Sequence, residues 1–172
     1  MRMKTITSTT EQRDHFLSLL RKFNSAMLVT ATSTGELHAR PMALAEVEED
    51  ACVWFITASD SPKVQEIEVD SHVSITAQDG ESCFLALSGR ARLVRDLRKV
   101  EALWREPFRV WFPNGPNDPT IELIAVTPEH GEYWDTTGVR RVSYLWAAAK
   151  AYLSKTTPET AMGDEHARVA LR

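Results

Sequence analysis

A predicted strand runs directly into a predicted helix in Val53-Trp54-Phe55-Ile56-Thr57-Ala58-Ser59-Asp60-Ser61-Pro62-Lys63. The first half of this stretch is β-branched and aromatic, the residue types that favour a half-buried strand. Ser61 followed by Pro62 is typical of a helix start, because a serine hydroxyl can accept a hydrogen bond from a free backbone N–H and the fixed φ of proline suits the first turn. The sequence therefore predicts a strand that ends near Thr57 and a short helix that begins at Pro62.

The residue after this proline is a lysine, whose charge is unfavourable at the positive end of a helix dipole by roughly 0.3–1 kcal/mol. A bound anion would reverse that penalty, because backbone N–H groups, the Lys63 ammonium and the Thr57 and Ser61 hydroxyls could converge on one phosphate. A solvated lysine at a surface helix start is the alternative. The stretch indicates a candidate phosphate site and leaves both interpretations open.

The composition is that of an ordinary globular protein, with 172 residues, 43% of them apolar and 26% charged. We predict a single domain over 1–155 with helices near both ends, followed by a flexible tail over 156–172. The formal net charge of −4 has the wrong sign for a general nucleic-acid-binding surface. No apolar run approaches the length of a membrane span, and no apolar segment near Met1 marks secretion. We therefore expect a cytoplasmic protein without nucleic-acid or membrane partners.

The metal-ligating residue types are scattered along the chain. Cys52 and Cys83 both fall in predicted strands, where buried free thiols are expected, and no metal-binding spacing surrounds them. None of the five histidines has another at the helical spacing of four residues. We therefore predict no metal site.

The rest of the chain reads mainly as strands, because the apolar period changes from that of a helix to that of a strand at Ser25. An amphipathic helix with Phe16, Leu19 and Leu20 on its apolar face precedes this point, after capping residues at 8–12. About six strands are predicted, over 27–30, 37–44, 51–57, 72–77, 83–94 and 121–126. The segment 132–135 is predicted to end the sheet, 46–50 to form an acidic turn, and 140–155 to be helical. Such antiparallel strands with flanking helices indicate a barrel or a sandwich.

Two strands carry features that bear on the site. Pro41 cannot donate to a sheet ladder, so its strand is expected at an edge or a bulge. Its interruption beside Arg40 would leave backbone groups free for a ligand, or it is an edge-strand proline that discourages aggregation. In the strand 83–94, Gly89 is small on the apolar side, which predicts close packing inside a curved sheet.

Four motifs in this order resemble the pyridoxamine 5′-phosphate oxidase-like proteins, and more narrowly their bacterial general stress proteins. The motifs are His38-Ala39-Arg40-Pro41-Met42, Trp54-Phe55-Ile56-Thr57 with Ser61-Pro62-Lys63, Ser88-Gly89-Arg90-Ala91, and Glu132-Tyr133-Trp134-Asp135. The resemblance covers roughly 23–135. It implies a six-stranded antiparallel split β-barrel of the FMN-binding type, which forms a homodimer with two flavin sites at the subunit interface.

The resemblance also implies a set of cofactor-binding residues, namely Arg40, Pro41, Met42, Phe55, Ile56, Thr57, Ser61, Lys63 and Trp134. Thr57, Ser61 and Lys63 match the positions that hold the FMN phosphate. Arg40 matches a basic residue that reaches the same phosphate or the ribityl chain. Phe55 and Ile56 match the strand that passes beside the isoalloxazine. Trp134 matches the aromatic residue that the second subunit presents.

Two departures separate this chain from the vitamin B6 oxidases of that family. Those enzymes carry a second basic residue just before the lysine, where this chain has Pro62. They also carry an arginine and histidine pattern after the tryptophan motif that grips the substrate, and residues 136–141 lack that pattern. Oxidation of pyridoxamine phosphate is therefore not expected.

The function predicted from this resemblance is that of a flavin-dependent oxidoreductase that uses a nicotinamide or another small reductant. The flavin would supply the chemistry, so no catalytic side chain is assigned. His38 is the nearest acid–base candidate, with a structural histidine as the alternative. A non-catalytic flavin-binding, sequestering or regulatory stress protein is the second hypothesis. FAD or a deazaflavin would suit the same phosphate pocket, whereas haem would need an axial ligand that we do not identify.

Dimer formation is also indicated by exposed aromatic bulk. A turn-rich loop carries Trp111 and Phe112, which are expected to pack on their own barrel or to meet a partner. With Trp104 and Trp134, they are more aromatic surface than the loops of a small barrel readily bury, and two-fold dimers are the commonest oligomers.

Overall fold

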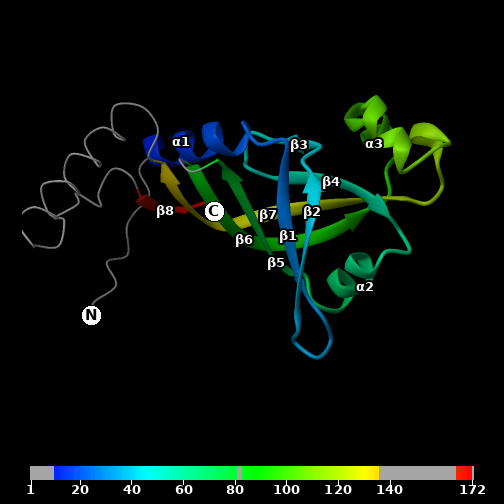
Figure 1. Ribbon diagram of the computed structural model, residues 1–172, viewed down its shortest axis with the longest axis horizontal. Coiled ribbons are helices and arrows are strands. Elements are labelled where there is room, and N and C mark those ends of the chain that lie inside the picture. Colours follow the sequence, from blue (N-terminus) through cyan, green and yellow to red (C-terminus); the bar gives the residue numbers. More distant parts are fainter. Residues whose placement is uncertain (1–9, 81–82, 136–165, 172) are drawn as a thin grey trace, which may run out of the picture.

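The computed structural model describes residues 10–80, 83–135 and 166–171 of the chain. A curled antiparallel sheet forms its centre, and the helices pack around that sheet (Figure 1). The elements follow in chain order as α1 (Thr10–Leu20), β1 (Ser25–Ala31), β2 (Leu37–Ala43), β3 (Glu46–Val47), β4 (Val53–Ala58), α2 (Pro62–Val69), β5 (His72–Asp79), β6 (Cys83–Val94), α3 (Leu97–Leu103), the 3-10 helices η1 (Glu106–Val110) and η2 (Gly115–Asn117), β7 (Ile121–Asp135) and β8 (His166–Ala170). None of the helices in these ranges is both long and apolar enough to cross a membrane.

Neighbouring strands of the described sheet are antiparallel and lie in the order β2-β1-β5-β6-β7-β4-β3, with β8 beside β7. The long strand β7 pairs with β6 on one side, and on its other side with β4 over 121–126 and with β8 over 130–134. The sheet therefore curls into a half-barrel. The prediction of a mainly β, antiparallel barrel is confirmed. The described sheet has eight strands, because β3 and β8 add to those that were predicted.

The two predicted segments 121–126 and 132–135 are one continuous strand, β7. Pro128 and Gly131 suggest an interruption in the sequence. Strand β7 nevertheless continues through this point, because its register with β6 shifts between Ser88 and Gly89 and leaves room for an extra residue after Pro128. A β-bulge thus keeps the strand whole where the pattern predicted a break.

Glycine is required at this bulge. A Cβ atom on Gly89 would lie 2.2 Å from the backbone oxygen of Thr127. Backbone atoms cannot turn aside as a side chain can, so any larger residue would force the two strands apart. The close packing predicted for Gly89 is confirmed.

Two predictions about the remaining chain need correction. The flexible tail over 156–172 is wrong at its end, because β8 pairs with β7 and Ala167, Val169 and Leu171 are buried. The alternation of buried and exposed residues in β8 is too short to indicate a strand in the sequence. Its partner β7 also lies far from it along the chain. The acidic turn over 46–50 begins as a strand, since β3 pairs with the start of β4.

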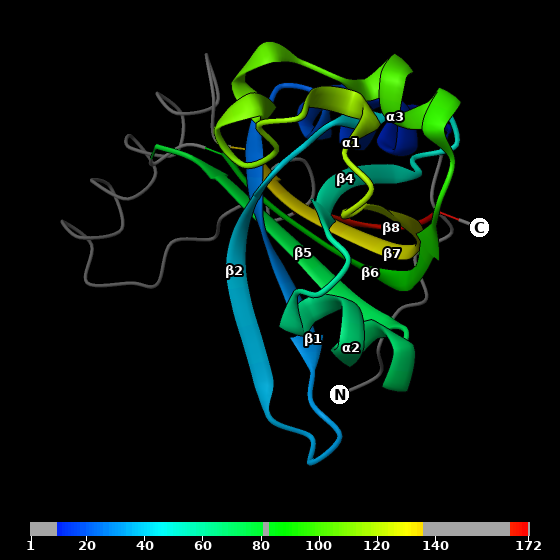
Figure 2. The same cartoon turned by 90° about the vertical axis from the view of Figure 1, so that its right-hand side faces the viewer.

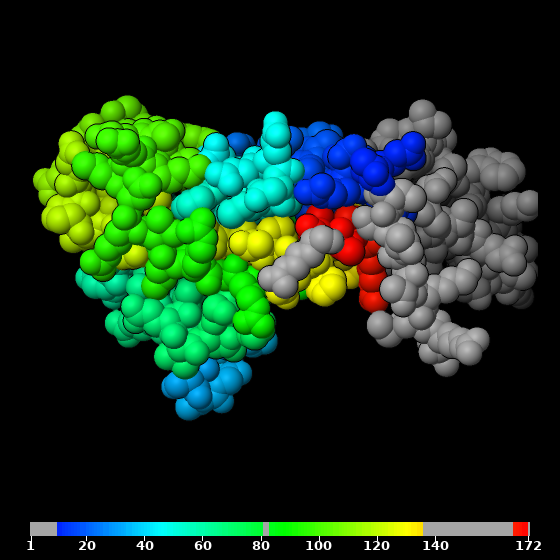
Figure 3. All heavy atoms as spheres, turned by 180° about the vertical axis from the view of Figure 1, so that it is seen from behind, coloured from blue at the N-terminus to red at the C-terminus, as the bar shows by residue number. Residues whose placement is uncertain are grey.

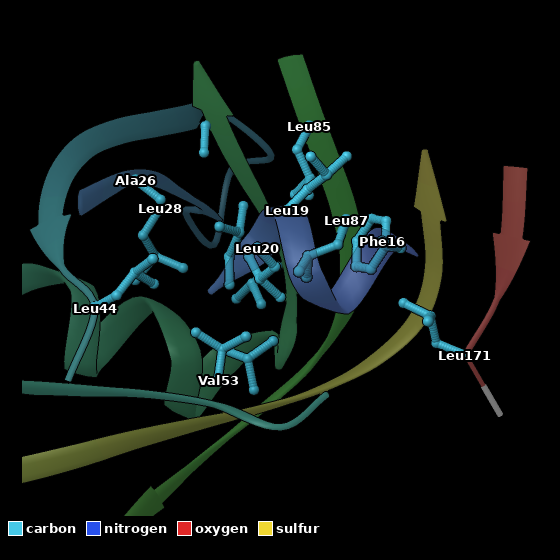
Figure 4. Packing of buried hydrophobic residues seen from close by; sticks show 14 of the residues in the cluster. Phe16, Leu19, Leu20, Ala26, Leu28, Leu44, Val53, Leu85, Leu87 and Leu171 are labelled. Atoms are coloured by element: carbon cyan, nitrogen blue, oxygen red, sulfur yellow. The ribbon is translucent and has the colours of Figure 1, made fainter. Parts of the chain in front are cut away.

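Helix α1 covers the hollow of the curled sheet with its predicted apolar stripe. Phe16, Leu19 and Leu20 are buried in the main core, where they meet side chains from several strands (Figure 4). The residues predicted to cap this helix at 8–9 lie outside the described residues, and so does the helix predicted over 140–155.

Strand β4 separates two apolar clusters. Successive side chains of a strand point to opposite faces, so Phe55 belongs to the main core, whereas Trp54 and Ile56 pack with the α3 region in a second cluster. Asp96 caps α3 as its side chain accepts a hydrogen bond from the Lys99 backbone N–H at 3.2 Å. The end of β4 therefore lies between α2 on one side and the α3 region on the other.

The segment around β3 anchors the α3 region to the rest of the chain. Lys99 Nζ donates to Glu46 at 2.6 Å and to Glu48 at 2.7 Å, and Arg105 donates to a backbone oxygen of the same segment at 2.8 Å. Arg21, which directly follows α1, donates to it from the other side, so the segment lies between α3 and α1 (Figure 3). This anchoring holds η1, which follows α3, beside β2 and β4.

Candidate functional site

A cavity of about 500 Å³ lies at the end of β4. Its walls come from the start of β1, from β2 and β4, from the start of α2 and from the η1 region. Figure 2 views the molecule from the side on which β2, β4 and α2 are seen together. The volume is typical of small-molecule sites. The described lining residues are Ser25, Arg40, Pro41, Met42, Ala43, Ile56, Thr57, Ala58, Lys63, Phe108, Trp111 and Phe112.

The polar groups that the sequence singled out meet at one end of this cavity. Lys63 Nζ donates to Thr57 Oγ1 at 2.9 Å, and Ser61 Oγ lies 3.3 Å from the same oxygen. Thr57 is buried, and Lys63 and Ser61 are half-buried. The prediction that the Ser61 hydroxyl caps the helix was wrong, since it makes no side-chain cap bond and faces Thr57 instead. The start of α2 thus presents an ammonium and two hydroxyls within one small volume.

The electrostatics of this end favour an anion. Burial lowers the pKa of Lys63 below its ordinary value of 10.5, and the nearby positive charge of Arg40 lowers it further, against the opposing effects of Glu66 and Asp60. A group whose charged form is disfavoured in this way gains most from a ligand of opposite charge. The helix start adds backbone N–H groups of the same polarity.

Arg40, on the neighbouring wall, has a protein partner that was not predicted. Its Nη2 donates to the buried Glu66 carboxylate at 2.8 Å, and its Nη1 donates to the Thr30 hydroxyl. Thr30 in turn donates to Glu66, and His38 Nδ1 lies 2.6 Å from the other carboxylate oxygen. The one sequence signal for this network is that Glu66 lies one helical turn after Lys63 on the same helix face.

Glu66 is ionised in this network. Burial raises its pKa, but hydrogen bonds from Thr30, His38 and Arg40 outweigh the burial, so that its pKa lies below the ordinary 4.5. The carboxylate therefore balances the charge of the Arg40 guanidinium.

The other end of the cavity is apolar. Met42 of β2, Ile56 of β4 and the aromatic rings of Phe108, Trp111 and Phe112 line it. The indole of Trp111 is 77% exposed although it lines the cavity, so it stands at the mouth. The cavity as a whole suits an amphipathic ligand with an anionic end and a flat apolar end.

The β2 wall is an edge of the described sheet, because its hydrogen-bonded neighbour there is β1 alone. The prediction of an edge strand at Pro41 is confirmed, and Pro41 also lines the cavity. Both interpretations of this proline are therefore compatible with the structure.

Most of the residues implied by the resemblance come together in this way, but two do not. Arg40, Pro41, Met42, Ile56, Thr57 and Lys63 line the cavity, and Ser61 adjoins it through Thr57. The side chain of Phe55 is fully buried in the main core, because the strand alternation turns it away from Ile56. Trp134 lies opposite Phe84, near the end of β7 that is remote from β4, and within one chain it does not reach the cavity.

Sequence reasoning missed the contribution of the η1 region to the cavity wall. Phe108, Trp111 and Phe112 follow α3 along the chain. The polar contacts of α3 with the β3 segment and apolar packing against β4 hold them at the site. The signal that could have indicated them is the pair of large aromatics in an otherwise turn-rich loop.

Comparison with known proteins gives a family and a set of similar folds. The family model described as pyridoxamine 5′-phosphate oxidase like matches residues 11–159. A structure assigned as general stress protein 26 from Jannaschia sp. CCS1 is 26% identical, with a TM-score of 0.72, and the match covers 94% of this chain and 99% of that one. The general stress FMN/FAD binding protein from Xanthomonas citri is 26% identical, with a TM-score of 0.64 and coverages of 76% and 92%.

General stress protein 26 from Bacillus anthracis str. Sterne shares the fold at 18% identity, with a TM-score of 0.62 and coverages of 70% and 92%. A search of the curated proteins found no significant match. The family match spans most of the sequence, and the curled sheet and the ordered motifs agree with it. The chain belongs to the pyridoxamine 5′-phosphate oxidase-like family.

Proposed function

We propose that this chain binds FMN in the cavity at the end of β4, with the phosphate at Lys63 and the isoalloxazine at the apolar end. The observation that carries the proposal is the half-buried Lys63 ammonium, 2.9 Å from Thr57 Oγ1 at the start of α2. The residues fit the cofactor, because the cation and hydroxyls match a phosphate and the aromatic wall matches a planar ring. The FMN/FAD binding protein from Xanthomonas citri supports the same ligand class. FAD is the alternative cofactor.

With FMN bound, the chain would act as a flavin-dependent oxidoreductase toward a nicotinamide or another small reductant. Bound flavin supplies hydride and electron transfer, and the protein supplies position and surroundings. Here Lys63 and Thr57 would hold the phosphate, and Met42, Ile56 and Trp111 would exclude water from the ring.

A non-catalytic flavin-binding or regulatory role is the second candidate, and one observation favours it. Among the described residues that line the cavity, none is a histidine, aspartate, glutamate, cysteine or tyrosine. His38, the nearest acid–base candidate in the sequence, is engaged with Glu66 at 2.6 Å. The described cavity wall could therefore hold a flavin ring, but it supplies no side chain that would transfer protons to or from that ring at neutral pH.

Flavin titration followed by mass identification of the bound cofactor tests the binding. We expect FMN to bind with a defined stoichiometry and to shift the flavin spectrum, because the ring moves from water to an apolar wall. Absence of any flavin binding would refute the proposal. NAD(P)H consumption by the loaded protein then separates the two roles, since turnover no faster than that of free flavin would leave only the binding role.

We also propose a homodimer with the flavin at the subunit interface. Met27, Phe84 and Trp134 are large exposed apolar residues on the outer face of the sheet, and Phe84 and Trp134 lie opposite each other on β6 and β7. Met27 pairs with Pro41, so this outer face continues to the wall of the cavity. A second copy seated there would bury the apolar face and bring its own Trp134 toward the flavin.

Light scattering checks the dimer. Phe84→Glu is expected to convert a dimer at micromolar concentration into a monomer and to weaken flavin binding, because it places a charge in the interface. Leu97→Glu, which changes an exposed leucine on α3, is the matched control and should leave both unchanged. A wild-type monomer at this concentration would contradict the proposal.

A further inference from the structure

The buried Glu66 carboxylate joins helix α2 to both strands of the β1–β2 hairpin. Its Oε2 accepts hydrogen bonds from Thr30 of β1 and from Arg40 of β2. Its Oε1 lies 2.6 Å from Nδ1 of His38, also on β2. Because Arg40 donates to Thr30 as well, the three side chains of Thr30, Arg40 and Glu66 form a closed triangle of hydrogen bonds.

This triangle holds two walls of the cavity against each other. Lys63 precedes Glu66 by one turn, so the same face of α2 carries the ammonium and the carboxylate. Arg40, Pro41 and Met42 belong to the β2 wall, and β2 hydrogen-bonds only to β1 within the described sheet. The position of Lys63 relative to the β2 wall therefore depends on Glu66.

The same contacts engage the guanidinium of Arg40. Two of its nitrogens donate to Thr30 and Glu66, and the charge of Glu66 balances its own. Lys63, by contrast, donates to the neutral hydroxyl of Thr57. Arg40 also lines the cavity and has further N–H groups, so Glu66 fixes the orientation in which its guanidinium faces a ligand at this end.

We propose that Glu66 is a positioning residue of the phosphate site, and that it fixes the place of both Lys63 and Arg40 relative to a bound phosphate. This inference rests on the proposed flavin binding. If Glu66 instead withheld Arg40 from the phosphate, removal of the Glu66 charge would release Arg40 to the ligand and tighten FMN binding.

The test compares FMN with riboflavin, which has the same ring and lacks the phosphate. In Glu66→Gln the dissociation constant of FMN is expected to rise about tenfold, equivalent to about 1.4 kcal/mol, while that of riboflavin stays unchanged. Glu68→Gln, which removes the same charge from an exposed position of the same helix, is the matched control and should change neither constant. Unchanged or tighter FMN binding in Glu66→Gln would overturn the inference.

A double-mutant cycle then separates the role of Arg40. If Glu66 and Arg40 act as one unit, the variant that combines Arg40→Gln with Glu66→Gln loses about as much FMN affinity as either single variant. Independent effects, which would multiply to roughly a hundredfold loss, would contradict the proposal that Glu66 positions Arg40.

Removal of one partner of a buried ion pair also costs stability, so unfolding in urea is measured for each variant without flavin. If Glu66→Gln does not fold, Thr30→Val replaces it. Thr30 is 1% exposed and is absent from the described cavity wall, so it acts only through its neighbours. Its loss should weaken FMN binding about threefold and leave riboflavin binding unchanged. An unchanged constant for FMN would count against the inference.

Comparison of the FMN and riboflavin affinities of the wild-type protein distinguishes a failure of the proposed phosphate site from a failure of the role proposed for Glu66. Equal affinity for FMN and riboflavin would refute the phosphate site and this inference together. A preference for FMN that survives in Glu66→Gln and in Thr30→Val would refute the inference alone.

Discussion

Lys63→Ala is expected to weaken FMN binding by about 1.5–3 kcal/mol, a rise in the dissociation constant of about 10- to 150-fold. The ammonium is half-buried beside Thr57 and Ser61, where its interaction with a phosphate is screened less than at the open surface. Fluorescence titration with FMN and riboflavin measures the effect. Riboflavin should bind both proteins alike, because it carries no phosphate.

The control for this prediction is Lys22→Ala, which removes the same charge from an exposed residue that does not line the cavity. Its FMN affinity should equal that of the wild type. Equal FMN affinity in Lys63→Ala would remove the basis for the phosphate site.

The same lysine makes the FMN affinity depend on pH, with a decrease at alkaline pH. The pKa of Lys63 lies below 10.5 because of burial and the charge of Arg40, and only the protonated form attracts a phosphate dianion. The FMN affinity should therefore fall as the pH rises through the pKa of Lys63 in the free protein. In Lys63→Arg the guanidinium stays protonated, so this alkaline decline should disappear.

Phe55→Ala is expected to lower the free energy of unfolding by about 3–5 kcal/mol, the cost of deleting a buried aromatic side chain. Phe55 is fully buried in the main core and lies opposite Ile124 on β7. The void that the substitution leaves lies inside the main core, where side chains held on paired strands relax only partly into it. Urea denaturation of the flavin-free protein measures the loss.

Leu37→Ala, at a leucine that is 73% exposed, is the control and should change stability little. At pH and temperature where the variant stays folded, Phe55→Ala should keep most of its FMN affinity, because its side chain points away from the cavity. A near-wild-type stability combined with a large loss of FMN affinity would show that Phe55 faces the ligand.

Much of the fold was predictable, because it depends on interactions between neighbours in the chain. The turn from strand to helix over 53–63 follows from β-branched residues and the fixed φ of Pro62. The amphipathic helix α1 follows from the period of Phe16, Leu19 and Leu20. The bulge at Gly89 was anticipated as a close approach, although the strand that approaches it could not be named.

The strands β3 and β8 could not be predicted for a physical reason. Each is short, and a strand of so few residues has too little alternation to differ from a loop. They exist because β4 and β7 offer free edges, which are properties of the assembled sheet and not of the short segments themselves.

The sequence by itself determined that Thr57, Ser61 and Lys63 would come together, since they lie within one strand end and one helix start. Only the tertiary structure decided the partner of Arg40, because Glu66 is 26 residues away from it and 36 from Thr30. It also decided that Ile56 meets the cavity while Phe55 meets the core, since alternation separates two neighbouring side chains but does not say which face holds the ligand. Contacts between neighbours can be derived from residue types, whereas contacts across the sheet depend on how the whole chain closes.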